Sequence, residues 1–314
     1  MSILIYHYGA LGDFITALPS FRFLKNRFSG TITLLGKPAF GTLALQAGYA
    51  DTFLDADSSR FRFLFSPGKD SGALRAFSEQ FTAVALFSDE DAPISVNTRK
   101  YFPGTQYCIP PIPAGKRPAA DRFMDLFPME TVPFENIPKV SIRALSSEGK
   151  ITATFIREQH PFMVIHPGSG SILKNWPFRN FIEVASLMKN KGYTVVWLSG
   201  PAERQTDIPV GAVHFNNLSL PDCCILLEHS SIYLGNDSGI THLAAATGTK
   251  VVALFGPSDS SIWAPRGTGS ITVLHASPPA GCAPCHLRAT DGRNCGHSCM
   301  TRIPVQEVVE ALLS

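Results

Sequence analysis

The feature that most constrains this fold is an apolar strand, a glycine-rich turn and an amphipathic helix that follow one another directly at the start of the chain. The run 3–8 is typical of a short strand, and the turn Gly-Ala-Leu-Gly-Asp follows over 9–13. Apolar residues at helical spacing predict one buried stripe on a helix over 14–28, and Gly30 ends it. The next strand is expected over 31–35. Because parallel strands are joined by a right-handed crossover, this pattern predicts a β-α-β unit of a parallel sheet.

The second half of the chain repeats this order of elements. Strand 162–166 leads into the loop 167–176, and a helix over 177–191 begins at Pro177 and ends before Gly192. The remaining expected elements are strands over 53–54, 82–87, 194–198, 212–215, 232–235 and 251–255, and helices over 38–47, 72–80, 221–229, 240–247 and 304–313. This alternation favours an α/β fold with parallel sheets.

The stretch 101–138 interrupts the alternation. Its many prolines predict loops with one short helix near 123–127. A chain of 314 residues suits two α/β domains of about 150 residues each. We place the boundary so that the domains are 1–158 and 159–314.

Composition excludes several classes of protein. Net charge is +2 and the basic residues form no run, so the sequence does not indicate a nucleic-acid-binding protein. The N-terminus lacks the basic region of a signal peptide, and no apolar run approaches the roughly 20 residues that span a bilayer. We therefore expect a soluble, cytoplasmic protein. Seven cysteines, four of them close together near residue 290, indicate reduced thiols or a metal site rather than a disulfide framework.

Asp13 fits two roles. A carboxylate at the start of a helix accepts backbone N–H groups as an N-cap. The same carboxylate lies at the carboxyl edge of a parallel sheet, which is where α/β proteins bind ligands. Local chemistry alone favours the cap.

Two loops of the second half have the composition of phosphate-binding loops. The first offers Ser169, Gly170 and Lys174, that is, a hydroxyl, open backbone and a cation next to a helix start. The second is Asn-Asp-Ser-Gly over 236–239, which precedes a helix whose first N–H groups would face an anion together with Ser238. An ordinary surface loop remains the alternative for the first. For His242, one turn into the helix, a packed and hydrogen-bonded histidine is the simpler interpretation than a proton carrier.

Taken together, these motifs resemble those of the bacterial ADP-heptose:lipopolysaccharide heptosyltransferases, glycosyltransferase family 9. Any one motif is weak, whereas five in the family's order across nearly the whole chain are specific. The motifs are Gly9-Ala10-Leu11-Gly12-Asp13, Lys174-x-Trp176-Pro177, Gly200-Pro201-x-Glu203, Asn236-Asp237-Ser238-Gly239 with His242, and Leu254-Phe255-Gly256-Pro257.

The resemblance implies a GT-B fold, with two Rossmann-like domains whose parallel sheets face a central cleft. It implies an N-terminal acceptor-binding domain and a C-terminal nucleotide-sugar-binding domain, and the last helix can pack back on the N-terminal domain. Asp13 would be the general base, across the cleft from the donor. The donor-binding residues would be Ser169, Gly170, Lys174, Glu203, Asp237, Ser238, Gly239 and His242.

Four cysteines form the last constellation, Cys282-x2-Cys285-x9-Cys295-x3-Cys299. Thiols at these spacings can hold a structural zinc or iron ion, and reduced thiols in a loop are the alternative. Four thiolates leave no open coordination position, so a catalytic metal is not expected here. Cys223 and Cys224 lie on the expected helix 221–229 and are most simply core residues.

The sequence thus predicts an inverting, metal-independent glycosyltransferase that moves a heptose from ADP-heptose to a lipopolysaccharide-core or related glycan. Its acceptor would be lipid-linked, so the protein is expected to visit the inner face of the membrane without spanning it. Two alternatives remain open: transfer of a different sugar from another nucleotide, and a non-catalytic protein that binds a nucleotide sugar.

Overall fold

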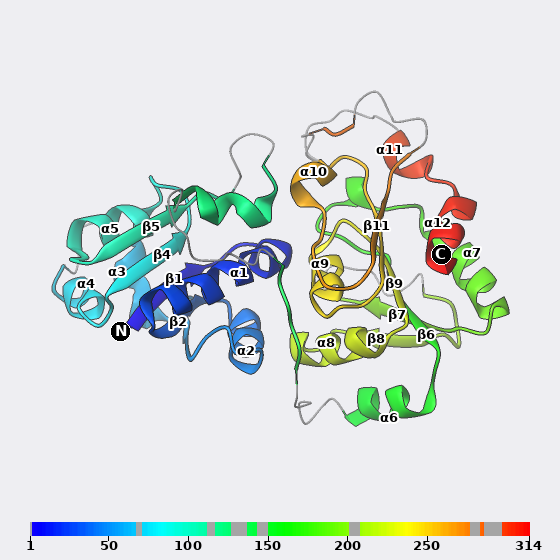
Figure 1. The fold of residues 1–314 in the computed structure, drawn as a ribbon, viewed down its shortest axis with the longest axis horizontal. Coiled ribbons are helices and arrows are strands. Elements are labelled where there is room, and N and C mark those ends of the chain that lie inside the picture. The colour runs from blue at the N-terminus through cyan, green and yellow to red at the C-terminus, as the bar shows by residue number, and fades with distance from the viewer. Residues whose placement is uncertain are drawn as a thin grey trace. The chain divides into compact units, whose positions relative to one another are not determined.

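The chain divides into two compact units, Met1–Pro138 and Lys139–Ser314, each with its own parallel sheet (Figure 1). The computed structural model describes residues 2–66, 71–111, 117–126, 137–142, 150–200, 208–276, 283–285 and 297–314. The sequence-based boundary between 158 and 159 differs from this division because helix α6 (Lys150–Glu158) belongs to the second unit. The ring of Phe155 in α6 contacts those of Phe162 and Phe215, at centroid distances of 5.2 and 5.6 Å.

The first unit contains a five-stranded sheet in the order β3-β2-β1-β4-β5, with every neighbouring pair parallel. The chain adds β2 and β3 on one side of β1 and then returns to add β4 and β5 on the other side. The strands are β1 (Ser2–His7), β2 (Thr31–Gly36), β3 (Thr52–Asp55), β4 (Ala83–Phe87) and β5 (Thr105–Ile109). The strand order therefore reverses between β1 and β4, and this is where open α/β sheets bind ligands at their carboxyl edge.

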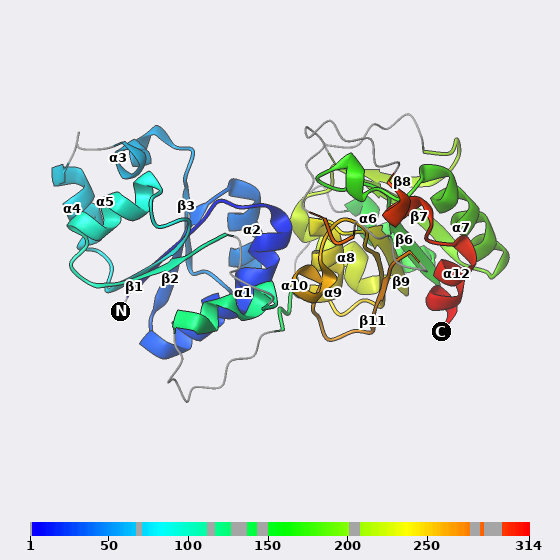
Figure 2. The same cartoon turned by 90° about the horizontal axis from the view of Figure 1, so that it is seen from above.

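Helices cover both faces of this sheet: α1 and α2 lie on one face, and α3, α4 and α5 on the other (Figures 1 and 2). Their bounds are α1 (Leu11–Phe28), α2 (Pro38–Gln46), α3 (Arg62–Phe65), α4 (Ser71–Ser78) and α5 (Pro93–Tyr101), with 3-10 turns at Ser59–Phe61 and Ala119–Leu126. Phe14, Leu18 and Phe21 of the predicted stripe are fully buried, but every residue from 14 to 21 is buried, so this part of α1 is enclosed on all sides rather than along one stripe.

Strand β5 corrects the expectation of loops throughout 101–138. Pro103 precedes the strand and Pro110 follows it, so the five residues Thr105–Ile109 contain no proline and pair with β4 along their full length. The short helix expected near 123–127 is instead the 3-10 turn Ala119–Leu126.

The second unit holds a six-stranded parallel sheet in the order β11-β10-β9-β6-β7-β8. Its strands are β6 (Phe162–His166), β7 (Thr194–Ser199), β8 (Val213–Asn216), β9 (Ile232–Asn236), β10 (Val251–Leu254) and β11 (Ile271–Leu274). From β6 the chain builds outward through β7 and β8 and then returns to β9. The reversal of strand order lies between β6 and β9, so the loops that follow these two strands meet at the carboxyl edge.

On this sheet, α7 and α12 cover one face, and α8 and α9 cover the other (Figures 1 and 2). The helices are α7 (Phe178–Asn190), α8 (Leu220–His229), α9 (Gly239–Ala246), α10 (Ser260–Trp263), α11 (Ser298–Thr301) and α12 (Val305–Leu313), with a 3-10 turn at Ile172–Lys174. Cys223 and Cys224 are buried on α8, where burial raises the pKa of Cys223 to about 12. Both are therefore core residues.

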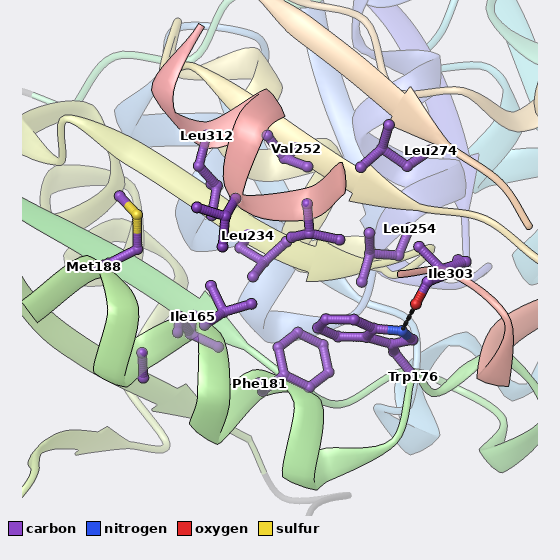
Figure 3. Packing of buried hydrophobic residues seen from close by; sticks show 14 of the residues in the cluster. Ile165, Trp176, Phe181, Met188, Leu234, Val252, Leu254, Leu274, Ile303 and Leu312 are labelled. Atoms are coloured by element: carbon purple, nitrogen blue, oxygen red, sulfur yellow. Dashed lines mark hydrogen bonds between the residues drawn. The ribbon is translucent and has the colours of Figure 1, made fainter. Parts of the chain in front are cut away.

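The core under α7 and α12 is built around Trp176, whose ring meets that of Phe181 edge-on at 5.0 Å (Figure 3). Truncating a buried aromatic side chain of this kind to alanine typically costs about 3–5 kcal/mol. Helix α12 adds Val308, Val309 and Leu312 to the same core. The last helix thus buries its apolar face in the core of the second unit, and its packing on the first unit stays a prediction.

In the described part of the chain, no helix is both long and apolar enough to cross a bilayer.

Candidate functional site

The predicted site residues lie at the carboxyl edges of both sheets. Asp13 belongs to the first unit and follows β1. The described members of the predicted donor group belong to the second unit and follow β6 and β9.

Asp13 is the third residue of α1, not its N-cap, because the helix begins at Leu11. Its Oδ2 accepts the backbone N–H of Ala10 at 3.3 Å, so the carboxylate still serves the start of the helix. The side chain is half-buried. One hydrogen bond to one oxygen leaves the carboxylate capable of accepting a proton from a ligand, so the capping and chemical roles are compatible.

Gly9 brings the turn close to both β1 and Asp13. A Cβ at this position would lie 3.1 Å from Cε1 of His7 and 3.4 Å from Oδ2 of Asp13. A side chain here would therefore press on the ring of His7 and would touch the carboxylate only at ordinary contact distance, so the close approach to His7 favours glycine.

Lys37 is a residue that the sequence analysis missed. It follows β2, and its Nζ donates a hydrogen bond to the carbonyl oxygen of Gly9 at 2.8 Å. The ammonium also lies 4.9 Å from the ring centroid of Tyr8 and 5.4 Å from that of Phe40. Lys37 is 24 positions from Asp13 in the sequence, so only the register of β1 and β2 brings it to this turn.

Next to Lys37, the hydroxyl of Tyr8 donates to Oδ1 of Asp57 at 2.6 Å. This hydrogen bond raises the pKa of Tyr8 above its usual value, although the pair is solvent-exposed. The turn that carries Asp13 is thus surrounded by a cation, a phenol and a second carboxylate, all at the carboxyl edge of the first sheet.

In the second unit, the loop 167–176 is held partly by its own side chains. Ser169 Oγ lies 2.7 Å from the carbonyl oxygen of Ser171 and 2.6 Å from Oδ1 of Asn175. It also accepts the backbone N–H of Ser171 at 3.2 Å. Ser169 therefore shapes the loop, whereas a Cβ at Gly170 would meet no atom within 4 Å. Gly170 faces open space.

Lys174 and Asp237 form an ion pair at the point where the strand order reverses. Lys174 Nζ lies 2.6 Å from Oδ2 of Asp237, which is 8% exposed, whereas the Lys174 side chain is 35% exposed. The backbone N–H of Asp237 donates to the carbonyl oxygen of Leu254 on β10. This hydrogen bond holds the backbone of Asp237 in place. The structure thus brings together two predicted residues that are 63 positions apart in the sequence.

Asn236 connects the same two loops and was overlooked as a site residue. Its Nδ2 donates to the carbonyl oxygen of Pro167 at 2.6 Å, and its Oδ1 accepts the backbone N–H of Trp176 at 3.0 Å. The sequence gives a partial signal, because an asparagine at a strand end is typical of loop fixing, but its partners depend on the tertiary fold.

At the start of α9, Ser238 is the N-cap and is nearly buried. Its Oγ accepts the backbone N–H of Thr241 at 3.3 Å and lies 3.5 Å from Nδ1 of the buried His166. The hydroxyl is turned into the helix start, so the N–H groups of Gly239 and Ile240, both half-buried, are the groups left for an anion. His242 is buried at 7% exposure in α9.

Some predicted residues lie outside the described part of the chain: Glu203, Cys282 and Cys295. Of the other two cysteines, Cys285 is half-buried and Cys299 buried. Within the described ranges, no group of three or more histidine, cysteine or acidic side chains could hold a metal ion. The structural metal site at the four cysteines stays a prediction.

Comparison with known proteins points to one family. Residues 111–290, which are 180 of the 314 residues, match the model of glycosyltransferase family 9 (heptosyltransferase). Lipopolysaccharide heptosyltransferase 3 of Escherichia coli is 31% identical over 121 residues, which cover 35% of this chain and 35% of that protein. The sequence similarity therefore spans about a third of the length of this curated relative.

Solved structures extend the similarity of fold to nearly the whole chain. The ADP-heptose LPS heptosyltransferase II of E. coli superposes with a TM-score of 0.70 at 18% identity, over 100% of this chain and 98% of that one. The E. coli heptosyltransferase WaaC, solved with ADP, superposes with a TM-score of 0.58 at 16% identity, over 87% of this chain and 93% of that one. The α/β fold with two parallel sheets is thus that of the GT-B heptosyltransferases.

Proposed function

Because the chain belongs to glycosyltransferase family 9, we propose that it is an inverting transferase that moves a heptose from ADP-heptose to a lipopolysaccharide-core or related glycan. The observation that carries the proposal is the Lys174–Asp237 pair, at 2.6 Å, beside the N-terminus of α9. Lys174 supplies a cation, and the N-terminus of α9 supplies backbone N–H groups. Both lie at the edge of the sheet where α/β proteins bind nucleotides. The relatives that carry ADP or ADP-heptose in their names support the choice of donor.

In this proposal the second unit binds the donor. The diphosphate would take a hydrogen bond from Lys174 and from the N–H groups of Gly239 and Ile240. As the bond between the anomeric carbon and the diphosphate oxygen breaks, negative charge grows on the leaving ADP, and these donors stabilise it more strongly than they stabilise the bound substrate. In this proposal, groups of the protein stabilise the developing charge, and no divalent ion is required.

The first unit would supply the base. Asp13 accepts the proton of the acceptor hydroxyl while that oxygen forms the new bond to the anomeric carbon. Attack opposite the departing ADP inverts the configuration at that carbon. The products are the extended glycan and ADP, and the proton resides on Asp13 until it passes to water.

The proposal is tested by calorimetry and thermal unfolding of the purified protein with ADP, UDP, GDP and CMP, followed by a transfer assay with ADP-heptose. We expect selective binding of ADP, which stabilises the folded protein. Lys174→Ala should weaken ADP binding by about tenfold to a hundredfold, because a charge-assisted hydrogen bond is lost. Lys25→Ala is a matched control, since Lys25 forms a comparable pair with Asp51 at 2.8 Å on the first unit and should leave ADP binding unchanged.

Selective binding of UDP or GDP would overturn the choice of ADP-heptose and favour another nucleotide sugar. Binding of ADP with no transfer to any glycan would favour the non-catalytic alternative. If none of the four nucleotides binds, the assignment of the donor site itself is wrong.

A further inference from the structure

We propose that Asn236 is a positioning residue of the donor site, which holds the loop 167–176 in the conformation that presents Lys174. The inference deepens the proposed function and rests on it, because the value of the loop's conformation depends on what Lys174 binds. It adds a role for a residue that touches no reacting atom.

The side chain of Asn236 joins the two ends of one loop. Pro167 is the first residue after β6, and its carbonyl oxygen accepts a hydrogen bond from Asn236 Nδ2 at 2.6 Å. Trp176 lies nine positions further on, and its backbone N–H donates to Asn236 Oδ1 at 3.0 Å. Asn236 itself is at 0% exposure. The loop is therefore closed by one buried amide rather than by a hydrogen bond between its own ends.

Only a carboxamide of this length fits both tasks. One end of the loop presents a carbonyl oxygen and needs a donor, whereas the other presents an N–H and needs an acceptor. A carboxylate has no donor for Pro167, and an alanine has neither group. Alanine would leave the buried N–H of Trp176 and the part-buried carbonyl of Pro167 without this partner, whereas aspartate would leave only the carbonyl without one, and we expect the loop to move away from β9 in response.

The segment at the end of β9 also contacts the ammonium of Lys174. Asn236 is followed directly by Asp237, which pairs with Lys174 at 2.6 Å, so one short segment both closes the loop and orients its ammonium. Trp176 adds a second anchor, since its indole N–H donates to the carbonyl oxygen of Ile303 at 3.1 Å in the core (Figure 3). Lys174 is thus two residues from a position fixed by both its backbone and its side chain.

The experiment compares Asn236→Ala and Asn236→Asp with a control, Asn97→Ala. Asn97 is a buried asparagine of the first unit, at 7% exposure, and its Nδ2 lies 3.0 Å from the carbonyl oxygen of Leu64 and 3.4 Å from that of Ser66. It therefore matches Asn236 in burial and in binding backbone carbonyls, but it touches no predicted donor residue. Asn236→Asp has nearly the size of the native side chain, which keeps the test valid if the alanine variant does not fold.

Two measurements separate positioning from general stability. The first is hydrogen exchange of the peptide 167–176, which should speed up about tenfold or more in both Asn236 variants and remain unchanged in Asn97→Ala. The second is calorimetry with ADP, whose affinity should fall at least about tenfold in the Asn236 variants at a temperature where they are folded. In the transfer assay, KM for the donor should rise while KM for the acceptor stays constant.

The inference is overturned if the Asn236 variants lose thermal stability as Asn97→Ala does but exchange this peptide and bind ADP like the wild type. It is also overturned if exchange speeds up equally across the whole second unit. If the wild-type protein binds no ADP, the proposed donor fails, while the exchange measurement still decides whether Asn236 holds the loop.

Discussion

The two units place their predicted site residues at the same edge of a parallel sheet but hold them in opposite ways. In the first unit, the turn that carries Asp13 is tied to β2 by the half-buried Lys37, and the neighbouring bond between Tyr8 and Asp57 is exposed. In the second unit, the loop that carries Lys174 is closed by Asn236, which is fully buried.

This difference indicates which contacts hold each candidate site in its conformation. Exposed charged contacts are screened by water and salt and contribute little, whereas hydrogen bonds in a buried site are strong and costly to break. We therefore expect the donor loop to be formed before a ligand arrives. We expect the turn with Asp13 to adjust more readily, so that substitutions around it change turnover more than stability.

The comparison is tested most severely by Asp13→Asn. The amide keeps an oxygen for the N–H of Ala10 but cannot accept the proton of the acceptor, so kcat should fall by about 10²- to 10⁴-fold. ADP affinity, measured by calorimetry, should stay within about twofold, because every predicted donor residue belongs to the other unit. Equal losses of turnover and of ADP affinity would contradict the assignment of Asp13 as the base.

A smaller effect is expected for Asp237→Asn. The ammonium of Lys174 is paired with Asp237, and a diphosphate bound as proposed would compete with this carboxylate. Removing its charge should tighten ADP binding by about threefold to fivefold, a modest gain because Lys174 is partly exposed to water. The gain should shrink as salt is added, since screening weakens the competition.

The control for this variant is the same change made in a Lys174→Ala background, where it should have no effect on ADP affinity. Weaker ADP binding in Asp237→Asn with Lys174 intact would show that the carboxylate supports the loop more than it competes with the diphosphate.

The smallest effect is expected for Lys37→Met. Methionine keeps apolar contact with Tyr8 and Phe40 but cannot donate to the carbonyl oxygen of Gly9. We expect kcat to fall by only about twofold to threefold, because the hydrogen bond comes from a charged but half-buried donor. ADP affinity should not change. Lys37→Arg should restore much of the lost rate, and failure of both variants to alter kcat would remove Lys37 from the site.

How much of the fold could be predicted follows from where each element lies in its sheet. The strands at 162–166 and 232–236 are central and buried on both faces, so they appear as continuous apolar runs. The four edge strands all have mostly intermediate burial and a weaker pattern: β3 and β8 were predicted, whereas β5 and β11 escaped notice. Helix α6 was missed as well, and it displaced the domain boundary.

Local sequence indicated candidate residues for the site but not the contacts between them. Glycine, serine, lysine and aspartate next to strand ends indicate phosphate chemistry from local sequence alone. The partner of Lys174 lies 63 positions away, and that of Lys37 lies 28 positions away, because strand order and register bring them together. The hydroxyl of Ser238 caps α9, as expected for a residue at this position, and whether it also faces an anion stays a prediction.

The hydrogen bond from Trp176 to Ile303 also has a consequence for folding during synthesis, because its two residues lie far apart in the chain. The first unit is one continuous segment, so its sheet can form while the ribosome is still translating the second. The loop that carries Lys174 is made midway through the chain, but its tryptophan finds its carbonyl partner only once Ile303 has emerged. A nascent chain halted before that residue could form the first sheet but not the contact that anchors the loop 167–176.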